Sequence, residues 1–240
     1  MRRWAWVVLL AAVCGGAVAA NRVEQLTIAG GQGVSRVPGR VQGYDHVDYR
    51  LTAHAGQTLR VRIETRHGAN YFNVLPPGAA DVAMFAGGAP DNAFEGVLPA
   101  DGVYQVRVYL MRAAARRHEA ARYRLSVELA GTPLPPLAAE RDALVSGTSF
   151  HAQATVPCAP AYLPVDSCAA GVVRRGRDGT ATVELRWGSE GLRRLLFIQG
   201  RAVSADAAGV LQVRRQDDWT IVEFEDGSRF EIPDALLFGG

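Results

Sequence analysis

The first half of the chain alternates between hydrophobic and polar residues with a period of two. This alternation is clearest in four segments, at 47–53, 58–65, 104–110 and 122–129. In the second of them Leu59, Val61 and Ile63 share one face, while Arg60 and Arg62 share the other. Such a pattern is typical of strands that bury one face. Glycines separate the segments at regular intervals, which predicts an all-β fold that begins with an eight-stranded antiparallel β-sandwich.

The second half of the chain also favours strands. They are expected at 181–187, 192–198, 210–215, 220–224 and 229–232. Short polar segments rich in glycine, such as 177–179 and 225–227, separate them and indicate turns. This half therefore predicts a small antiparallel β domain, either a meander or a partly closed barrel.

A proline-rich segment lies between the two halves. Residues 131–137 read Gly-Thr-Pro-Leu-Pro-Pro-Leu, and prolines remove backbone donors and favour extended chain. Residues 138–144 favour a short helical turn. We expect a β-sandwich at 21–130, a linker at 131–150 and a small all-β domain at 151–240, whose role the sequence does not indicate.

The first twenty residues have the features of a signal peptide. Arg2 and Arg3 precede an apolar run at 4–13, and small residues follow at 17–20. The expected location is therefore periplasmic or secreted. Cys14 leaves open a lipoprotein with a lipidated N-terminus, although Val13 is larger than the residue usual before such a cysteine. No later apolar run approaches the length of a transmembrane span.

Cys158 and Cys168 are the two cysteines outside that segment. In an exported protein a disulfide between them is the default expectation, and it would staple the start of the second domain. A catalytic thiol would need a positioned histidine, and His151 is the nearest in the sequence.

Composition and motifs argue against several classes of function. The chain is 48% hydrophobic, and its 26 basic residues, all arginine, nearly balance 24 acidic ones. A net charge of +2 does not indicate a nucleic-acid-binding protein. Five scattered histidines form no zinc motif, and no G-x-S-x-G elbow is present. Acidic residues at 217–226 could act as paired carboxylates, but a solvated strand face explains them better. We expect no enzyme, no metal site and no cofactor.

Positive charge is densest in a stretch of eighteen residues. It holds six arginines, Arg107, Arg112, Arg116, Arg117, Arg122 and Arg124. Residues 111–121 connect two expected strands and are more numerous than a hairpin needs. Their alanines favour a helical turn, from which Arg112 and Arg116 would project on the same side. Two guanidinium groups on one loop suit a partner with carboxylates or phosphates, and the alternative is a solvated arginine-rich loop.

Tyr44 is a second candidate for binding. It directly precedes a strand in which Tyr49 belongs to the buried face. An aromatic side chain at a loop tip is a common anchor at protein interfaces. The alternative is a tyrosine packed over the edge of the sandwich. The aromatic residues at 70–78 are interpreted as a buried strand and turn.

Two segments carry a resemblance to a known family. They are V-x-G-Y-D-x-x-x-Y-x-L-x-A-x-x-G-Q-x-L-x-V at 41–61 and L-P-A-D-G-V-Y-Q-V-R-V at 98–108, which precedes the arginine loop. Over residues 30–130 the chain resembles the bacterial periplasmic inhibitors of goose-type (g-type) lysozyme. That resemblance implies a β-sandwich whose loops block the lysozyme cleft, with g-type lysozyme as the partner.

The resemblance also implies a contact surface. The tyrosine and the two arginines of the family fall on Tyr44, Arg112 and Arg116, with the four-residue spacing kept. The chain departs from the family at 113–115, where three alanines replace more polar residues. The same segments resemble sandwich domains appended to secreted peptidases. An envelope glycan- or lipopolysaccharide-binding module is therefore the alternative function.

Overall fold

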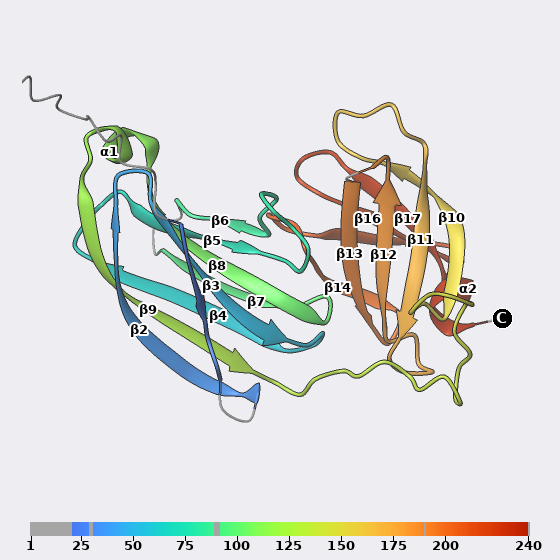
Figure 1. Ribbon diagram of the computed structural model, residues 1–240. Coiled ribbons are helices and arrows are strands. Elements are labelled where there is room, and N and C mark those ends of the chain that lie inside the picture. The colour runs from blue at the N-terminus through green and yellow to red at the C-terminus, as the bar shows by residue number, and fades with distance from the viewer. Residues whose placement is uncertain (1–20, 29–30, 89–91, 190, 240) are drawn as a thin grey trace, which may run out of the picture.

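The computed structural model describes residues 21–28, 31–88, 92–189 and 191–239. The expected signal peptide and Cys14 lie outside these ranges. Two sets of strands follow one another along the chain, each with its own hydrophobic core. In Figure 1 they lie side by side, and an extended segment crosses from one to the other.

The N-terminal set is a sandwich of two sheets. The first sheet has the order β1 (Arg22–Gln25), β3 (His46–Ala53), β8 (Gly102–Leu110), β5 (Asn70–Leu75) and β6 (Phe85–Ala86). The second has the order β2 (Gly33–Gln42), β9 (Ala120–Ala130), β4 (Thr58–Thr65) and β7 (Ala93–Val97). The expected all-β sandwich is confirmed. The described strands are more numerous than the expected eight, because they include the short β1 and the two-residue β6. Strand β1 pairs with β3 in parallel, whereas the expected sandwich was antiparallel throughout.

The alternating residues take the faces that the pattern predicts. Leu59, Val61 and Ile63 are buried between the sheets, while Arg60 and Arg62 are exposed. Two tyrosines, Tyr49 on β3 and Tyr123 on β9, meet in this core and share a hydrogen bond of 3.0 Å between their hydroxyl groups. Burial raises the pKa of both phenols, because the charged phenolate would be poorly solvated there.

The C-terminal set is one antiparallel sheet that curls into a nearly closed barrel. Its strands are β10 (Ala152–Ala159), β11 (Ser167–Arg174), β12 (Ala181–Trp187), β13 (Gly191–Ile198), β14 (Arg201–Ala205), β15 (Gln212–Gln216), β16 (Trp219–Glu223) and β17 (Arg229–Pro233). In space they run β14-β13-β12-β11-β10-β17-β16-β15, and α2 (Asp234–Phe238) follows the last strand. The predicted disulfide is present: Cys158 on β10 and Cys168 on β11 are bonded, with their Cα atoms 5.8 Å apart.

The segment between the two sets has no regular helix or strand from residue 131 to residue 151. The expected helical turn at 138–144 is a single turn, in which the N–H of Arg141 donates to the carbonyl of Ala138 over 2.8 Å. The segment contacts the C-terminal sheet, since the N–H of Leu137 donates to the carbonyl of Arg174 over 2.8 Å.

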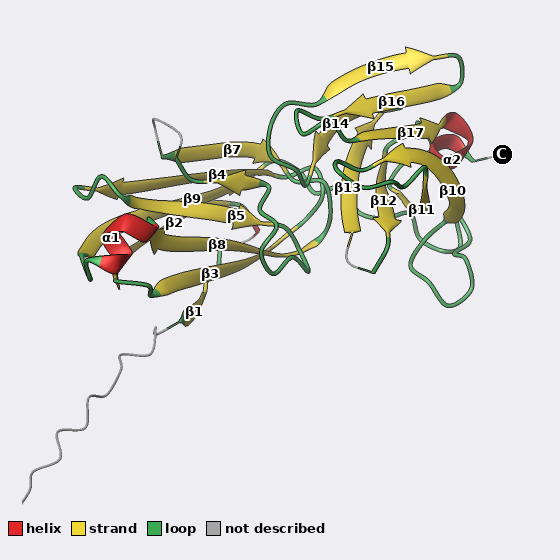
Figure 2. Cartoon of the chain, turned by 90° about the horizontal axis from the view of Figure 1, so that it is seen from above, coloured by secondary structure: helices red, strands yellow, loops and turns green. Residues whose placement is uncertain are grey.

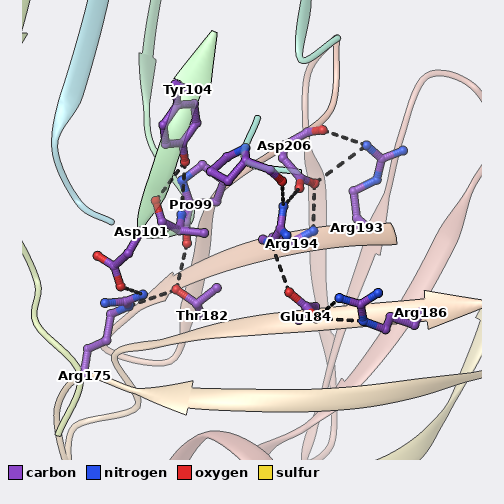
Figure 3. Close-up of polar contacts among 12 residues, drawn as sticks. Pro99, Asp101, Tyr104, Arg175, Thr182, Glu184, Arg186, Arg193, Arg194 and Asp206 are labelled. Carbon is purple, nitrogen blue, oxygen red and sulfur yellow. Dashed lines mark hydrogen bonds and ion pairs between the residues drawn. The ribbon is translucent and has the colours of Figure 1, made fainter. Parts of the chain in front are cut away.

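Polar contacts hold the C-terminal sheet against one end of the sandwich. Arg175 forms an ion pair with Asp101 at 2.7 Å, and the Thr182 hydroxyl donates to the Pro99 carbonyl over 2.7 Å (Figure 3). Arg194 donates to the carbonyl of Pro77 over 2.9 Å. These sandwich residues all lie in connections between strands. The C-terminal sheet therefore covers one group of sandwich loops and leaves the opposite end uncovered.

Candidate functional site

The arginine loop forms a short helix at the uncovered end of the sandwich. Helix α1 (Arg112–Arg116) connects β8 to β9, and Figures 1 and 2 both place it away from the C-terminal sheet. Ala114 and Ala115 are buried in the sandwich core, whereas Arg112 and Arg116 are exposed. The small side chains let the helix pack closely on the sheets. Of the three alanines at 113–115, Ala114 and Ala115 therefore anchor the helix and leave its arginines facing solvent.

The turn between β2 and β3 lies against this helix. The N–H of Gly43 donates to the Glu119 carbonyl over 2.9 Å, and Gly43 adopts a φ of +57°, which favours glycine. A Cβ at this position would lie 3.3 Å from Nδ1 of His118. The close approach sets Tyr44 beside α1 with 57% of its surface exposed. Tyr44, Arg112 and Arg116 thus lie on two adjacent loops at one end of the sandwich.

Charged residues beside the two candidate arginines form ion pairs with one another. Nε of Arg117 lies 2.5 Å from Oε1 of Glu119, and Nε2 of His67 lies 2.9 Å from Oε2 of the same carboxylate. The hydrogen bond from Arg117 holds the pKa of Glu119 below its usual value. Among the residues that the structure describes, no carboxylate lies within ion-pair distance of Arg112 or Arg116. Arg112 and Arg116 are both exposed to solvent.

The structure separates the other arginines of the cluster by role. Arg107 on β8 binds Asp48 on β3 through two hydrogen bonds of 2.8 and 3.1 Å. Asp48 is only 5% exposed, although its position in the alternating pattern predicts a solvated side chain. Arg107 is therefore a structural residue, while Arg122 and Arg124 lie exposed on the outer face of β9.

The alternative chemistry considered from the sequence has structural explanations. His151 accepts a hydrogen bond of 3.0 Å from the N–H of Arg174 through Nδ1, and both cysteines are consumed by the disulfide. In the acidic segment, Glu223 lies 3.4 Å from Arg214 and 3.7 Å from Arg229.

The described residues hold neither a candidate metal cluster nor a candidate membrane-spanning helix. Within the described ranges, His, Cys, Asp and Glu side chains form no group of three or more that could hold a metal ion. The described helices also include none that is long and apolar enough to cross a bilayer.

Sequence reasoning did not find the residues that frame the site. Glu119 and His67 come from different connections, and their ion pair depends on how β4 and β9 lie side by side. No local motif signals such a pair. The glycine before Tyr44 was the available signal, because a glycine at a tight turn often marks a close approach of two backbone segments.

Comparisons with known proteins point to one family. No family model matches the chain. The inhibitor of g-type lysozyme from Escherichia coli (strain K12) is 27% identical over 125 residues, which cover 51% of this chain and 92% of that protein.

Two solved structures are also similar to part of this chain. Aeromonas hydrophila PliG, a periplasmic lysozyme inhibitor of g-type lysozyme, is 36% identical and is covered completely by 46% of this chain, with a TM-score of 0.42. Salmonella Typhimurium PliG, also a periplasmic lysozyme inhibitor of g-type lysozyme, is 25% identical. The match covers 45% of this chain and 98% of that protein, with a TM-score of 0.37. Through about half of its length, this chain is therefore similar in sequence to a bacterial inhibitor of g-type lysozyme.

Proposed function

We propose that the protein is a periplasmic or secreted inhibitor of g-type lysozyme without enzymatic activity of its own. In this proposal α1 and the β2–β3 turn enter the catalytic cleft of the lysozyme. Arg112 and Arg116 bind cleft carboxylates, and Tyr44 packs beside them. The names of the related proteins support the choice of partner and compartment.

One observation carries the proposed mechanism. Arg112 and Arg116 are exposed at the two ends of a helix that the buried Ala114 and Ala115 hold in place, and Tyr44 lies on the adjacent turn. A binding surface that is already ordered loses little conformational freedom when a partner docks. The uncovered end of the sandwich also leaves room for that partner.

Physical chemistry explains why such a surface would inhibit. Glycosidases use a pair of carboxyl groups that flank the scissile bond. A guanidinium group that hydrogen-bonds such a carboxylate replaces the glycan and neutralises a charge needed for catalysis. Tyrosine adds apolar area and a hydroxyl group that can hydrogen-bond where sugar normally binds.

The test is the double variant Arg112→Ala with Arg116→Ala, titrated against a g-type lysozyme. Truncating one desolvated charge pair at an interface costs about 2–5 kcal/mol, so inhibition should weaken roughly thirtyfold or more. The matched control is Arg50→Ala, because Arg50 is an exposed arginine on β3 that hydrogen-bonds Gln105. Full inhibition by the double variant would exclude these arginines from the site.

The alternative, an envelope glycan-binding module, makes a different prediction. Such a module would sediment with isolated cell wall in the absence of any lysozyme. Co-sedimentation together with no inhibition of g-type, chicken-type or invertebrate-type lysozyme would favour that alternative.

A further inference from the structure

The outer face of the second sandwich sheet is strongly basic near α1. Side chains of β2, β9 and β4 that point away from the core, together with the residue after β4, form what we call the basic face. Its arginines, all exposed, are Arg36, Arg40, Arg62, Arg66, Arg122 and Arg124. Glu64 is the acidic residue described among them.

Cross-strand register brings these charges together. Arg40 on β2 lies directly opposite Arg122 on β9, and Arg36 lies opposite Ser126, which also pairs with Arg62 on β4. Like charges at directly opposed positions destabilise a sheet. Glu64 on β4 lies directly opposite Arg124 on β9 and offsets one of the six charges. The remaining excess of arginine does not serve the stability of the sheet.

At its other end the same face carries carboxylates beside its arginine. Arg60 on β4 forms ion pairs of 2.9 Å with both Glu95 on β7 and Glu128 on β9. Arg60 and Arg62 are two residues apart on one strand and point the same way. The contrast shows that this sheet can neutralise an arginine with cross-strand carboxylates, as it does for Arg60 near the C-terminal sheet.

An open groove lies at the α1 end of the basic face. It has a volume of about 780 Å³ and is lined by three arginines, Arg66, Arg122 and Arg124, by one carboxylate, Glu64, and by Pro38, Thr65, His67, Ala120, Ala121 and Tyr123. This volume falls within the range of small-molecule sites, roughly 300–1,000 Å³. Because β9 begins directly after the α1 loop, the groove adjoins the proposed inhibitory surface but lies on a different face.

We propose that the basic face is a second binding site, which takes a phosphorylated glycan. Outward residues of one strand repeat at about 7 Å, so Arg122 and Arg124 can each bind one phosphate of a ligand that carries several. Guanidinium forks match phosphate oxygens in two hydrogen bonds at once. The groove between these arginines and Arg66 has space for sugar rings.

Two other classes of ligand fit this face less well. Single-stranded nucleic acid needs exposed aromatic side chains on which bases stack. Of the two aromatic rings in the groove lining, Tyr123 is almost completely buried, and His67 is mostly buried and bound to Glu119. Protein interfaces are centred on exposed apolar or aromatic anchors. The exposed residues of this lining are instead Arg66, Arg122, Arg124, Glu64, Ala120 and Pro38. A polyanion with polar rings is the better match.

The experiment measures binding to the full-length mature protein by calorimetry at low salt. The probe is a soluble bisphosphorylated glucosamine disaccharide, and its unphosphorylated form and inorganic phosphate serve as comparison ligands. The triple variant Arg66→Gln, Arg122→Gln and Arg124→Gln should bind the probe at least tenfold more weakly. The matched variant Arg60→Gln, on the same sheet face, should bind it as the wild type does.

Each outcome bears on the proposal. Thermal unfolding should show that the triple variant folds, because the change relieves repulsion between like charges. Failure of the wild type to bind the probe, or equal binding by the folded triple variant, would overturn the proposal. Inorganic phosphate bound as tightly as the disaccharide would refute a glycan site. A triple variant that loses only lysozyme inhibition would show that the face belongs to the protein interface instead.

Discussion

Arg175 links the two sets of strands, and its removal tests how they depend on one another. Its side chain is 2% exposed and donates to Thr182 Oγ1 over 2.9 Å, to Asp101 Oδ2 over 2.7 Å and to the carbonyl of Leu134. Thr182 in turn donates to the carbonyl of Pro99 on the sandwich (Figure 3). The perturbation is Arg175→Met, which keeps most of the side-chain length and removes the charge.

The structure limits the size of the effect. Removing one partner of a buried ion pair costs about 3–5 kcal/mol, because the other charge is left uncompensated. Here Asp101 remains 33% exposed and keeps a hydrogen bond of 3.1 Å from the N–H of Ala55. Water can therefore solvate part of the carboxylate in the variant. We expect the free energy of unfolding to fall by about 2–3 kcal/mol.

Urea unfolding followed by tryptophan fluorescence measures this change. Both tryptophans outside the expected signal peptide, Trp187 and Trp219, lie in the C-terminal sheet, so the signal reports on that half. The matched control is Arg177→Met, because Arg177 is an exposed arginine that donates one hydrogen bond of 3.2 Å to the Arg141 carbonyl. It should change stability by less than about 0.5 kcal/mol.

Lysozyme inhibition and the pH dependence of stability provide two further measurements on Arg175→Met. Because α1 lies at the opposite end of the sandwich, Arg175→Met should leave lysozyme inhibition unchanged at temperatures where the variant is folded. Burial acts to raise the pKa of the Asp101 carboxyl group, but the hydrogen bond and charge of Arg175 hold that pKa below its ordinary value. The resulting contribution to folding stability is complete above the pKa that Asp101 has in the unfolded chain, about 3.9. It is lost as the pH falls through the lower pKa of the folded state.

Two results would refute this reasoning. A loss of less than about 0.5 kcal/mol at neutral pH would show that the two sets of strands do not depend on this contact. A stability difference between wild type and Arg175→Met that persists undiminished into strong acid would show that the charge of Asp101 is not its source.

Three further predictions concern single features. Replacing either Tyr49 or Tyr123 by phenylalanine should cost about 1–3 kcal/mol in urea unfolding, while the double variant should cost less than the sum, because no buried hydroxyl is left unpaired; strict additivity would contradict a shared hydrogen bond. Replacing both Cys158 and Cys168 by serine should lower the free energy of unfolding by about 2–3 kcal/mol, and a reducing agent should then have no further effect on stability. A stability loss well below this range would show that the disulfide contributes little. Gly43→Ala should weaken lysozyme inhibition while the core unfolds at nearly the same urea concentration. The positive φ costs an alanine about 1–2 kcal/mol, and the turn relieves this strain by moving Tyr44 away from α1. Unchanged inhibition would argue against Tyr44 as a contact.

The sequence by itself determined the local features of this protein. The period-two pattern identifies the buried faces of β3, β4, β8 and β9, because alternation along a strand is a property of consecutive residues. The disulfide follows from having two cysteines outside the expected signal peptide. The helical turn of α1 follows from its alanines, whose preference for helix is also local.

Only the tertiary structure decided which charges are used internally and which remain available. Arg107 and Arg112 are close in sequence, yet Arg107 is bound to Asp48 on β3, while Arg112 faces solvent. Arg60 is neutralised from two neighbouring strands, and Arg122 is placed opposite another arginine. These outcomes depend on cross-strand register between segments up to about ninety residues apart, which no local pattern encodes. The uncovered position of α1 likewise depends on where the C-terminal sheet docks, and that is decided by contacts between distant loops.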